Sequence, residues 1–308
     1  MKRFLIKTIL FSLMLALGFL ALMTQADGSS DEFYLKLTSP KQSSLIVGSS
    51  RAAQSIQPQY INDKVEDSLY NFAFSILHSP FGKAYHDLIS RKLNTQTTDG
   101  IFIIEVNPWT LSSQTEERED SLNFREVGSF VDKTHFVSIK PNPEYLIESY
   151  QEKNLNFITK KYRRGEYQTF YVEDDGWLEV VIESDMFSTA ERTKRKINSY
   201  RKKLDAQYKG FSKTRFDYLI KTIKMLQERG EVYLLRIPVN DDMYALELEL
   251  MEDFDNKMER LSETYDVPYF NFMNKRSHYQ YTDGHHLTID SGKQFSEELA
   301  SLILSNRE

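Results

Sequence analysis

The sequence predicts an α/β protein in which helices cover both faces of a central parallel sheet. Two observations lead to this prediction. Short, almost wholly apolar runs recur along the chain, and such runs are typical of strands buried on both faces. Segments with helical hydrophobic periodicity separate these runs, and alternation of strand and helix is the pattern of a three-layer α/β/α sandwich.

Three strands are expected in the first third of the chain, over residues 44–47, 68–75 and 101–104. The first strand ends at Gly48 and leads into a short helical turn over 51–56, which Pro58 limits. A longer helix is expected from about 82 to 93. Strand and helix therefore alternate regularly up to about residue 110.

The alternation resumes near residue 211. We expect, in order, a helix over 211–229, a strand over 231–238, one long acidic helix over 242–265, a short strand over 267–272 and a closing helix that begins near 290. The interval at about 112–209 is too long for a single loop, so it predicts an insertion with its own elements, including a hairpin that turns at 174–176.

Composition narrows the classes of function. The chain has 308 residues, of which 40% are hydrophobic, so it can bury a large core. The formal net charge of −6 argues against nucleic acid as a partner, and the basic residues between Arg192 and Lys203 are interpreted as a solvated helix face. The absence of cysteine excludes disulfides and a cysteine nucleophile. Because His285 and His286 are adjacent and no other ligand cluster is evident, we expect neither a metal nor a cofactor.

The N-terminus has the pattern of a membrane-targeting segment. Basic residues come first, and an apolar stretch that ends at Met23 is long enough to span a bilayer. Small residues at 24–26 would also suit signal-peptide cleavage. We expect residues 1–26 to be a signal anchor, with a cleaved signal peptide and secretion as the alternative. Both place the rest of the chain outside the cytoplasm, in the cell envelope or periplasm.

We expect a spacer over residues 27–42 and a single domain over 43–308. Within that domain, polar residues follow the first and the last strand. Gly48-Ser-Ser50 ends the first strand, where free N–H groups of a strand-to-helix turn could stabilise an oxyanion, although an ordinary loop has the same composition. Asp283 and His286 follow the last strand, and their spacing lets the carboxylate orient an imidazole that could deprotonate a serine. A surface turn is the other interpretation of this pair.

Together these two blocks resemble the SGNH (GDSL-type) hydrolase superfamily, which implies a flavodoxin-like α/β/α fold. Gly48-Ser-Ser50 stands where that family has Gly-Asp-Ser, so the resemblance places the nucleophile at Ser50 rather than at Ser49. Asp283-Gly-His-His286 matches the Asp-x-x-His block. The resemblance therefore implies a Ser-His-Asp triad of Ser50, His286 and Asp283.

The family's two middle blocks are matched less well. Asn107 in Glu105-Val-Asn-Pro108 is a partial counterpart of the Gly-x-Asn-Asp block, and the resemblance implies that its side chain is an oxyanion donor. The glycine of the second block has no counterpart over 71–76. The backbone N–H of Ser75 or Ile76 could replace it, because any residue except proline can donate.

The altered first block, the insertion and the anchor are similar to the branch with the D-alanine transfer protein of teichoic acid modification and the alginate O-acetylation proteins. This resemblance implies a serine esterase or O-acyltransferase that acts on acyl esters of cell-envelope glycans or similar polymers, with a membrane acyltransferase as a further partner. Hydrolysis and transfer both stay open. The alternative is a catalytically silent SGNH-fold protein that binds polysaccharide or scaffolds an envelope acyltransfer complex.

Overall fold

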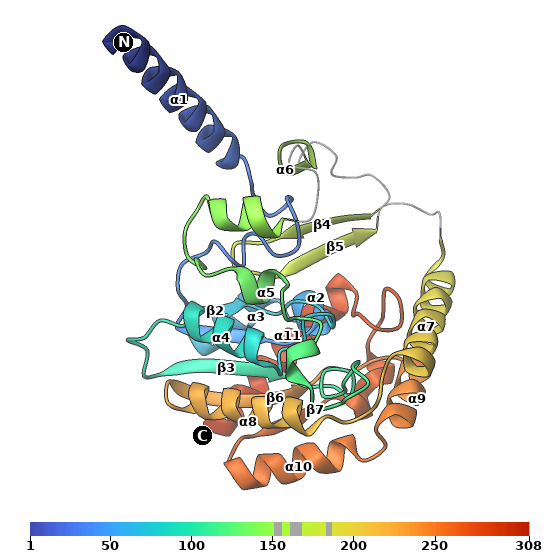
Figure 1. Cartoon of the computed structure of the whole chain (residues 1–308). Helices are drawn as coiled ribbons and strands as arrows, with labels where there is room; N and C mark the ends of the chain where they lie inside the picture. Colours follow the sequence, from blue (N-terminus) through green and yellow to red (C-terminus); the bar gives the residue numbers. More distant parts are fainter. Residues whose placement is uncertain (151–155, 161–167, 183–186, 308) are drawn as a thin grey trace.

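A five-stranded parallel sheet forms the centre of the domain in the computed structural model, which describes residues 1–307 except 151–155, 161–167 and 183–186 (Figure 1). Its strands are β1 (Ser44–Val47), β2 (Leu69–Asn71), β3 (Gly100–Glu105), β6 (Gly230–Arg236) and β7 (Tyr269–Asn271). They lie in the order β2-β1-β3-β6-β7, and each neighbouring pair is parallel. This confirms the predicted fold class.

Two groups of helices flank the sheet. The first comprises α2 (Ser50–Ser55), α3 (Pro58–Val65) and α11 (Ile289–Arg307), and α11 packs on the other two. The second includes α4 (Lys83–Lys92), α5 (Phe130–Lys133), α8 (Lys213–Gln227) and α10 (Phe254–Tyr265). Because the connections after β1 and β3 run in opposite directions along the sheet, a crevice is expected where those two strands end.

The predicted single helix over 242–265 is wrong, because the chain forms two helices there. α9 (Asp241–Leu250) ends at Met251, whose backbone is extended (φ −159°, ψ 85°), and α10 follows. The two halves face different apolar clusters. Met243 packs in a cluster around Trp109, whereas Met258 belongs to the main core. The change of direction at Met251 lets both halves bury their apolar faces.

The interval between β3 and β6 contains elements of its own. It includes the 3-10 helix η1 (Ser121–Asn123), the π-helix η2 (Tyr145–Ser149), α6 (Asn156–Thr159) and α7 (Thr189–Ala206). The predicted hairpin is present as β4 (Gln168–Val172) and β5 (Leu178–Ile182), which pair antiparallel outside the main sheet. Helix α7 packs against α9 and so borders the carboxyl edge of the sheet.

The chain begins with one exposed apolar helix, α1 (Lys2–Met23), which projects from the domain (Figure 1). Its length and composition are compatible with a signal anchor or a signal peptide. The residues that follow are packed on the domain, although the sequence predicts a spacer there. Tyr34, Lys36 and Leu37 are fully buried, and the ammonium of Lys36 donates to the carbonyl of Ala73 at 2.8 Å.

Candidate active site

Ser50 stands at the carboxyl end of β1, as the first residue of α2. The turn that presents it requires glycine, because a Cβ at Gly48 would lie 2.7 Å from the Cβ of Glu105 on β3. Ser49 caps α2 by accepting a hydrogen bond from the N–H of Arg51 at 3.3 Å. This cap leaves the half-buried Ser50 facing the crevice between β1 and β3.

The structure brings the three predicted triad residues together. Oγ of Ser50 lies 2.9 Å from Nε2 of His286, and Nδ1 of His286 lies 3.1 Å from Oδ2 of Asp283. Oδ1 of Asp283 accepts from the backbone N–H groups of His285 and His286, each at 3.0 Å. The carboxylate thus fixes both the turn and the orientation of the imidazole, the arrangement in which a histidine can deprotonate a serine.

Burial favours the neutral form of His286. Burial lowers the pKa of His286 below its ordinary value of 6.5, even though Asp283 opposes this shift. Nζ of Lys196, on α7, lies 2.8 Å from Oδ2 of Asp283. Burial alone would raise the pKa of Asp283, but His286 and Lys196 hold it below its ordinary value. An ionised carboxylate and a neutral imidazole are the protonation states that a general base needs.

Arg51, next to Ser50, is buried and forms an ion pair with Glu247 of α9. Its Nη2 also lies 3.3 Å from Nδ1 of His285. A guanidinium only donates, so Nδ1 of His285 accepts and its Nε2 carries the hydrogen, which is directed to Oη of Tyr200 at 3.0 Å. Burial, and next the charge of Arg51, lower the pKa of His285 well below its ordinary value. His285 is therefore a neutral donor behind the triad.

Asn107 follows β3 and lies at the same edge. Its Nδ2 is 2.5 Å from Oε1 of Glu105 and 3.4 Å from Oγ of Ser49. Oε2 of Glu105 in turn accepts from the N–H of Ser49 at 2.8 Å. Both hydrogens of the Asn107 amide thus have acceptors other than a ligand above Ser50. The oxyanion role of Asn107 stays a prediction.

An open cleft of about 550 Å³ lies over the triad. Besides Ser50, His286 and Asp283, it is lined by residues from the loop after β2, from β5 and from α7, among them Ser75, Ile76, Val180, Ile182 and Tyr200. Within the part of the chain that the structure describes, no group accepts a hydrogen bond from the backbone N–H of Ser50, Ser75 or Ile76. All three residues line the cleft, so their N–H groups are candidate donors to a ligand.

Among its described lining residues, the cleft has more basic than acidic side chains. Its basic residues come from α7, and they are Arg192, Arg195, Lys196 and Lys203, against the acidic side chains of Glu32 and Asp283. Lys196 pairs with Asp283, but no carboxylate of a described residue pairs with Arg195 or Lys203. The basic run that the sequence suggests to be a solvated face therefore borders the cleft, and it favours an anionic ligand.

Three residues around the site are missed by sequence reasoning: Lys196, Tyr200 and Glu247. The sequence could have indicated the first two, because spacings of four and three residues place Lys196, Tyr200 and Lys203 on one face of α7. For Glu247 the sequence gives only indirect evidence. The apolar strand around Arg236 predicts a buried arginine in need of a carboxylate, and Glu247 supplies it at 3.1 Å.

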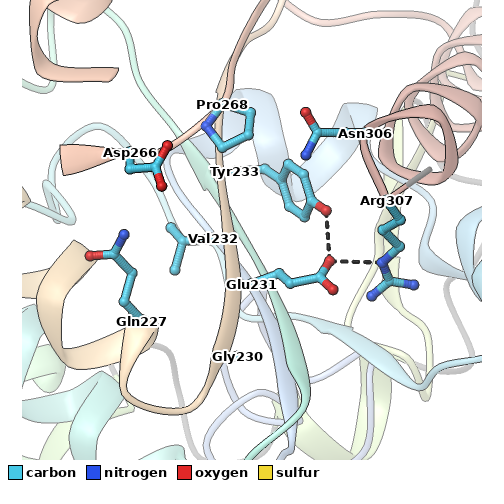
Figure 2. Close-up of a pocket in the computed structure, with 9 residues that line it drawn as sticks. All are labelled: Gln227, Gly230, Glu231, Val232, Tyr233, Asp266, Pro268, Asn306 and Arg307. Atoms are coloured by element: carbon cyan, nitrogen blue, oxygen red, sulfur yellow. Dashed lines mark hydrogen bonds and ion pairs between the residues drawn. The ribbon is translucent and has the colours of Figure 1, made fainter. Parts of the chain in front are cut away.

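A second pocket, of about 640 Å³, lies at the opposite edge of the sheet (Figure 2). It is bordered by Gly230 and Glu231 at the start of β6 and by Arg307 at the end of α11, and Glu231 accepts from Tyr233 at 2.6 Å and from Arg307 at 2.7 Å (Figure 2). Ligands of open α/β sheets bind at the carboxyl ends of the strands, and this pocket lies at the amino ends. The cleft over Ser50 is therefore the candidate site.

In the described ranges, no three His, Asp or Glu side chains converge in a way that could hold a metal ion. The described residues at the cleft include a serine, an imidazole, a carboxylate and backbone N–H donors. A scan against protein-family models and a search of curated proteins found no match for this chain.

Proposed function

We propose that this protein is an SGNH-type serine esterase or O-acyltransferase, held outside the cytoplasm by α1 and acting on acyl esters of carbohydrate polymers. One observation carries the proposal. The hydroxyl of Ser50, the imidazole of His286 and the carboxylate of Asp283 form one hydrogen-bonded series, with distances of 2.9 and 3.1 Å, at the floor of an open cleft.

The proposed reaction has two steps. Nε2 of His286 takes the proton from Oγ of Ser50 while the oxygen attacks the ester carbonyl carbon. The tetrahedral intermediate expels the alcohol, which receives the proton from His286, and the acyl group stays on Ser50. Water or a sugar hydroxyl then gives its proton to His286 and attacks the acyl carbon. The second tetrahedral intermediate expels Oγ of Ser50, which receives this proton back from His286, and the acid or the new ester is released. Asp283 stabilises the imidazolium in both steps.

Backbone groups are the proposed oxyanion donors. The N–H of Ser50 lies on the nucleophile itself, and Ser75 and Ile76 provide N–H groups from the facing loop. Removal of one such donor costs about 3 kcal/mol in comparable sites. Asn107 could add a donor only by releasing Glu105 or Ser49. That occupied amide is the observation that favours the silent, polysaccharide-binding alternative.

The charge of the cleft bears on the substrate. Arg195 stacks on the ring of Phe187, with its guanidinium carbon 3.7 Å from the ring centre, and Lys203 lies over Tyr200. These ring contacts hold two cations at the cleft, and neither cation forms an ion pair with a carboxylate of a described residue. We therefore favour a polymer that carries carboxylate or phosphate groups near its acyl ester.

The test is labelling and hydrolysis with the purified full-length chain in detergent. A fluorophosphonate probe should label Ser50, and Ser50→Ala should lose at least about 10³-fold of acetyl-ester hydrolysis. Ser301→Ala, which alters an exposed serine on α11, is the matched control and should keep full activity. If the probe does not label Ser50 in the parent chain and Ser50→Ala hydrolyses esters as fast as the parent, the enzyme proposal fails and the silent binding protein is favoured.

A further inference from the structure

The junction between α1 and the domain contains no free linker. Met23, the last residue of α1, is only 3% exposed, and Ala26 is only 2% exposed. Both belong to the main apolar core. The backbone turns at once, because the N–H of Ala26 donates to the carbonyl of Met23 at 3.2 Å. The core of the domain therefore begins where the apolar helix ends.

The length of α1 leaves little room for the domain to stand away from a membrane. Its 22 residues, at about 1.5 Å each, give about 33 Å, and the hydrocarbon core of a bilayer is about 30 Å thick. A membrane crossed by α1 would thus have its surface close to Met23. The parts of the domain that pack around this residue must then face the lipid headgroups.

The segment that packs on this junction carries exposed apolar side chains. Oη of Tyr145 donates to Asp31 at 2.6 Å, and Nδ2 of Asn142 donates to the carbonyl of Leu37 at 3.3 Å, so residues 136–147 are fixed against the chain that leaves α1. The exposed large apolar residues of this segment are what we call the apolar patch: Phe136 (57% exposed), Ile139 (47%) and Ile147 (62%). Exposed apolar residues grouped in this way typically mark an interaction surface.

The same junction also supports one wall of the cleft. The carbonyl of Gly28 accepts from the N–H of Val172 on β4, at 3.0 Å, and the paired strand β5 lines the cleft through Val180 and Ile182. Figure 1 shows β4 and β5 on the side of the domain from which α1 projects. Glu32, which also lines the cleft, follows Met23 by nine residues (32 − 23), which at full extension span about 30 Å.

From these observations we infer that the domain rests on the membrane that holds α1, with the apolar patch in the headgroup region and the cleft beside that surface. This inference rests on the proposed anchoring by α1. Continuity with the membrane-crossing helix selects lipid, rather than another protein, as the occupant of the patch. The cleft then receives an ester that a lipid or a membrane-bound molecule presents within about 30 Å of the bilayer surface.

Depth-dependent quenching of tryptophan fluorescence tests the inference. The full chain is placed in nanodiscs of phosphatidylcholine with brominated acyl chains, and single tryptophans are introduced by Leu13→Trp in α1, Ile147→Trp in the apolar patch and Leu248→Trp on α9. The native Trp109 and Trp177 are buried, so the parent chain supplies the background. Leu248 is the matched control, because it is exposed and belongs to α9, a helix that lies far from α1 in Figure 1.

We expect strong quenching of Leu13→Trp, at least twofold quenching of Ile147→Trp and none of Leu248→Trp. Quenching of Leu13→Trp with none of Ile147→Trp would overturn the docked orientation and leave the anchor in place. An unquenched Leu13→Trp would overturn the anchor and the docking together. None of these outcomes depends on ester hydrolysis, so failure of the enzyme proposal is measured separately.

Discussion

Replacing Glu247 by glutamine removes one charge from a buried cluster, and its effect on stability can be worked from the structure. Glu247 is fully buried and pairs with Arg51 and, at 3.1 Å, with Arg236, while it accepts from Nε1 of Trp109 at 3.2 Å. Arg236 has a second carboxylate partner in Asp255, whereas Arg51 has none among the described residues. Glu247→Gln therefore removes the carboxylate that is in ion-pair contact with the buried guanidinium of Arg51 and leaves no other such contact among the described residues.

Breaking a buried ion pair by removing one partner typically costs about 3–5 kcal/mol. Because glutamine keeps one acceptor oxygen for Trp109 or an arginine, we expect the lower end, a loss of about 3 kcal/mol in the free energy of unfolding. Such a loss lowers the ratio of folded to unfolded protein more than about 100-fold. It is a large share of the stability of an ordinary domain.

Urea unfolding of the full chain in detergent, followed by tryptophan fluorescence, measures this loss. Asp255→Asn is the matched control, because Asp255 is 29% exposed and its partner Arg236 keeps Glu247. Its loss should stay near about 1 kcal/mol. If Glu247→Gln costs no more than Asp255→Asn, the buried pair with Arg51 does not stabilise the fold as argued.

Three further predictions concern pH and charge. The proposed ester hydrolysis requires neutral His286, so kcat/KM should fall as pH decreases through a midpoint below 6.5. Lys196→Met should move that midpoint to higher pH, because the charge of Lys196 lowers the pKa of His286. An unchanged pH profile would contradict this effect of the ammonium that pairs with Asp283. The double variant Arg195→Gln/Lys203→Gln should have a kcat/KM for an anionic ester about tenfold lower than the parent, and an unchanged kcat/KM for a neutral ester. Equal losses of kcat/KM on both esters would argue against anion recognition. Burial lowers the pKa of Lys36 from 10.5 to about 7, so between pH 7 and pH 10.5 the unfolded chain binds more protons than the folded chain, and the free energy of unfolding should rise with pH. Lys36→Met should reduce the slope of this rise by up to about 1.4 kcal/mol per pH unit. If urea unfolding at several pH values gives the same slope for Lys36→Met and the parent, Lys36 is not the cause.

The sheet and the serine, histidine and aspartate of the site could be predicted because their signals are local. Buried parallel strands are apolar runs, and residues that follow such strands share one edge whatever the rest of the chain does. Ser50 and His286 are 236 residues apart in sequence; Ser50 comes soon after β1, and His286 lies in the connection between β7 and α11. Their contact, at 2.9 Å, could be predicted without knowing the structure of the residues between them.

The surroundings of the site could not be predicted, because they depend on contacts between distant elements. Nothing local distinguishes Glu247 from the other acidic residues of its helix, and only the packing of α9 against Arg51 explains its burial. The burial of Lys36 could not be predicted either, because this residue lies in a polar stretch of the sequence. Its buried ammonium donates a hydrogen bond to a carbonyl of the loop after β2, at 2.8 Å. The direction of the Asn107 amide is likewise decided by a buried carboxylate, Glu105.

The contact between Arg51 and His285 makes the two adjacent histidines, His285 and His286, differ in how readily they bind a proton. Their rings lie 4.4 Å apart, close enough that two titrating imidazoles would share their protons and show a drawn-out, two-step titration. Arg51 occupies Nδ1 of His285 with a permanent donor, so His285 keeps one tautomer and takes up no proton where His286 does. The pair should therefore bind a single proton, and its NMR titration should follow a simple one-site curve.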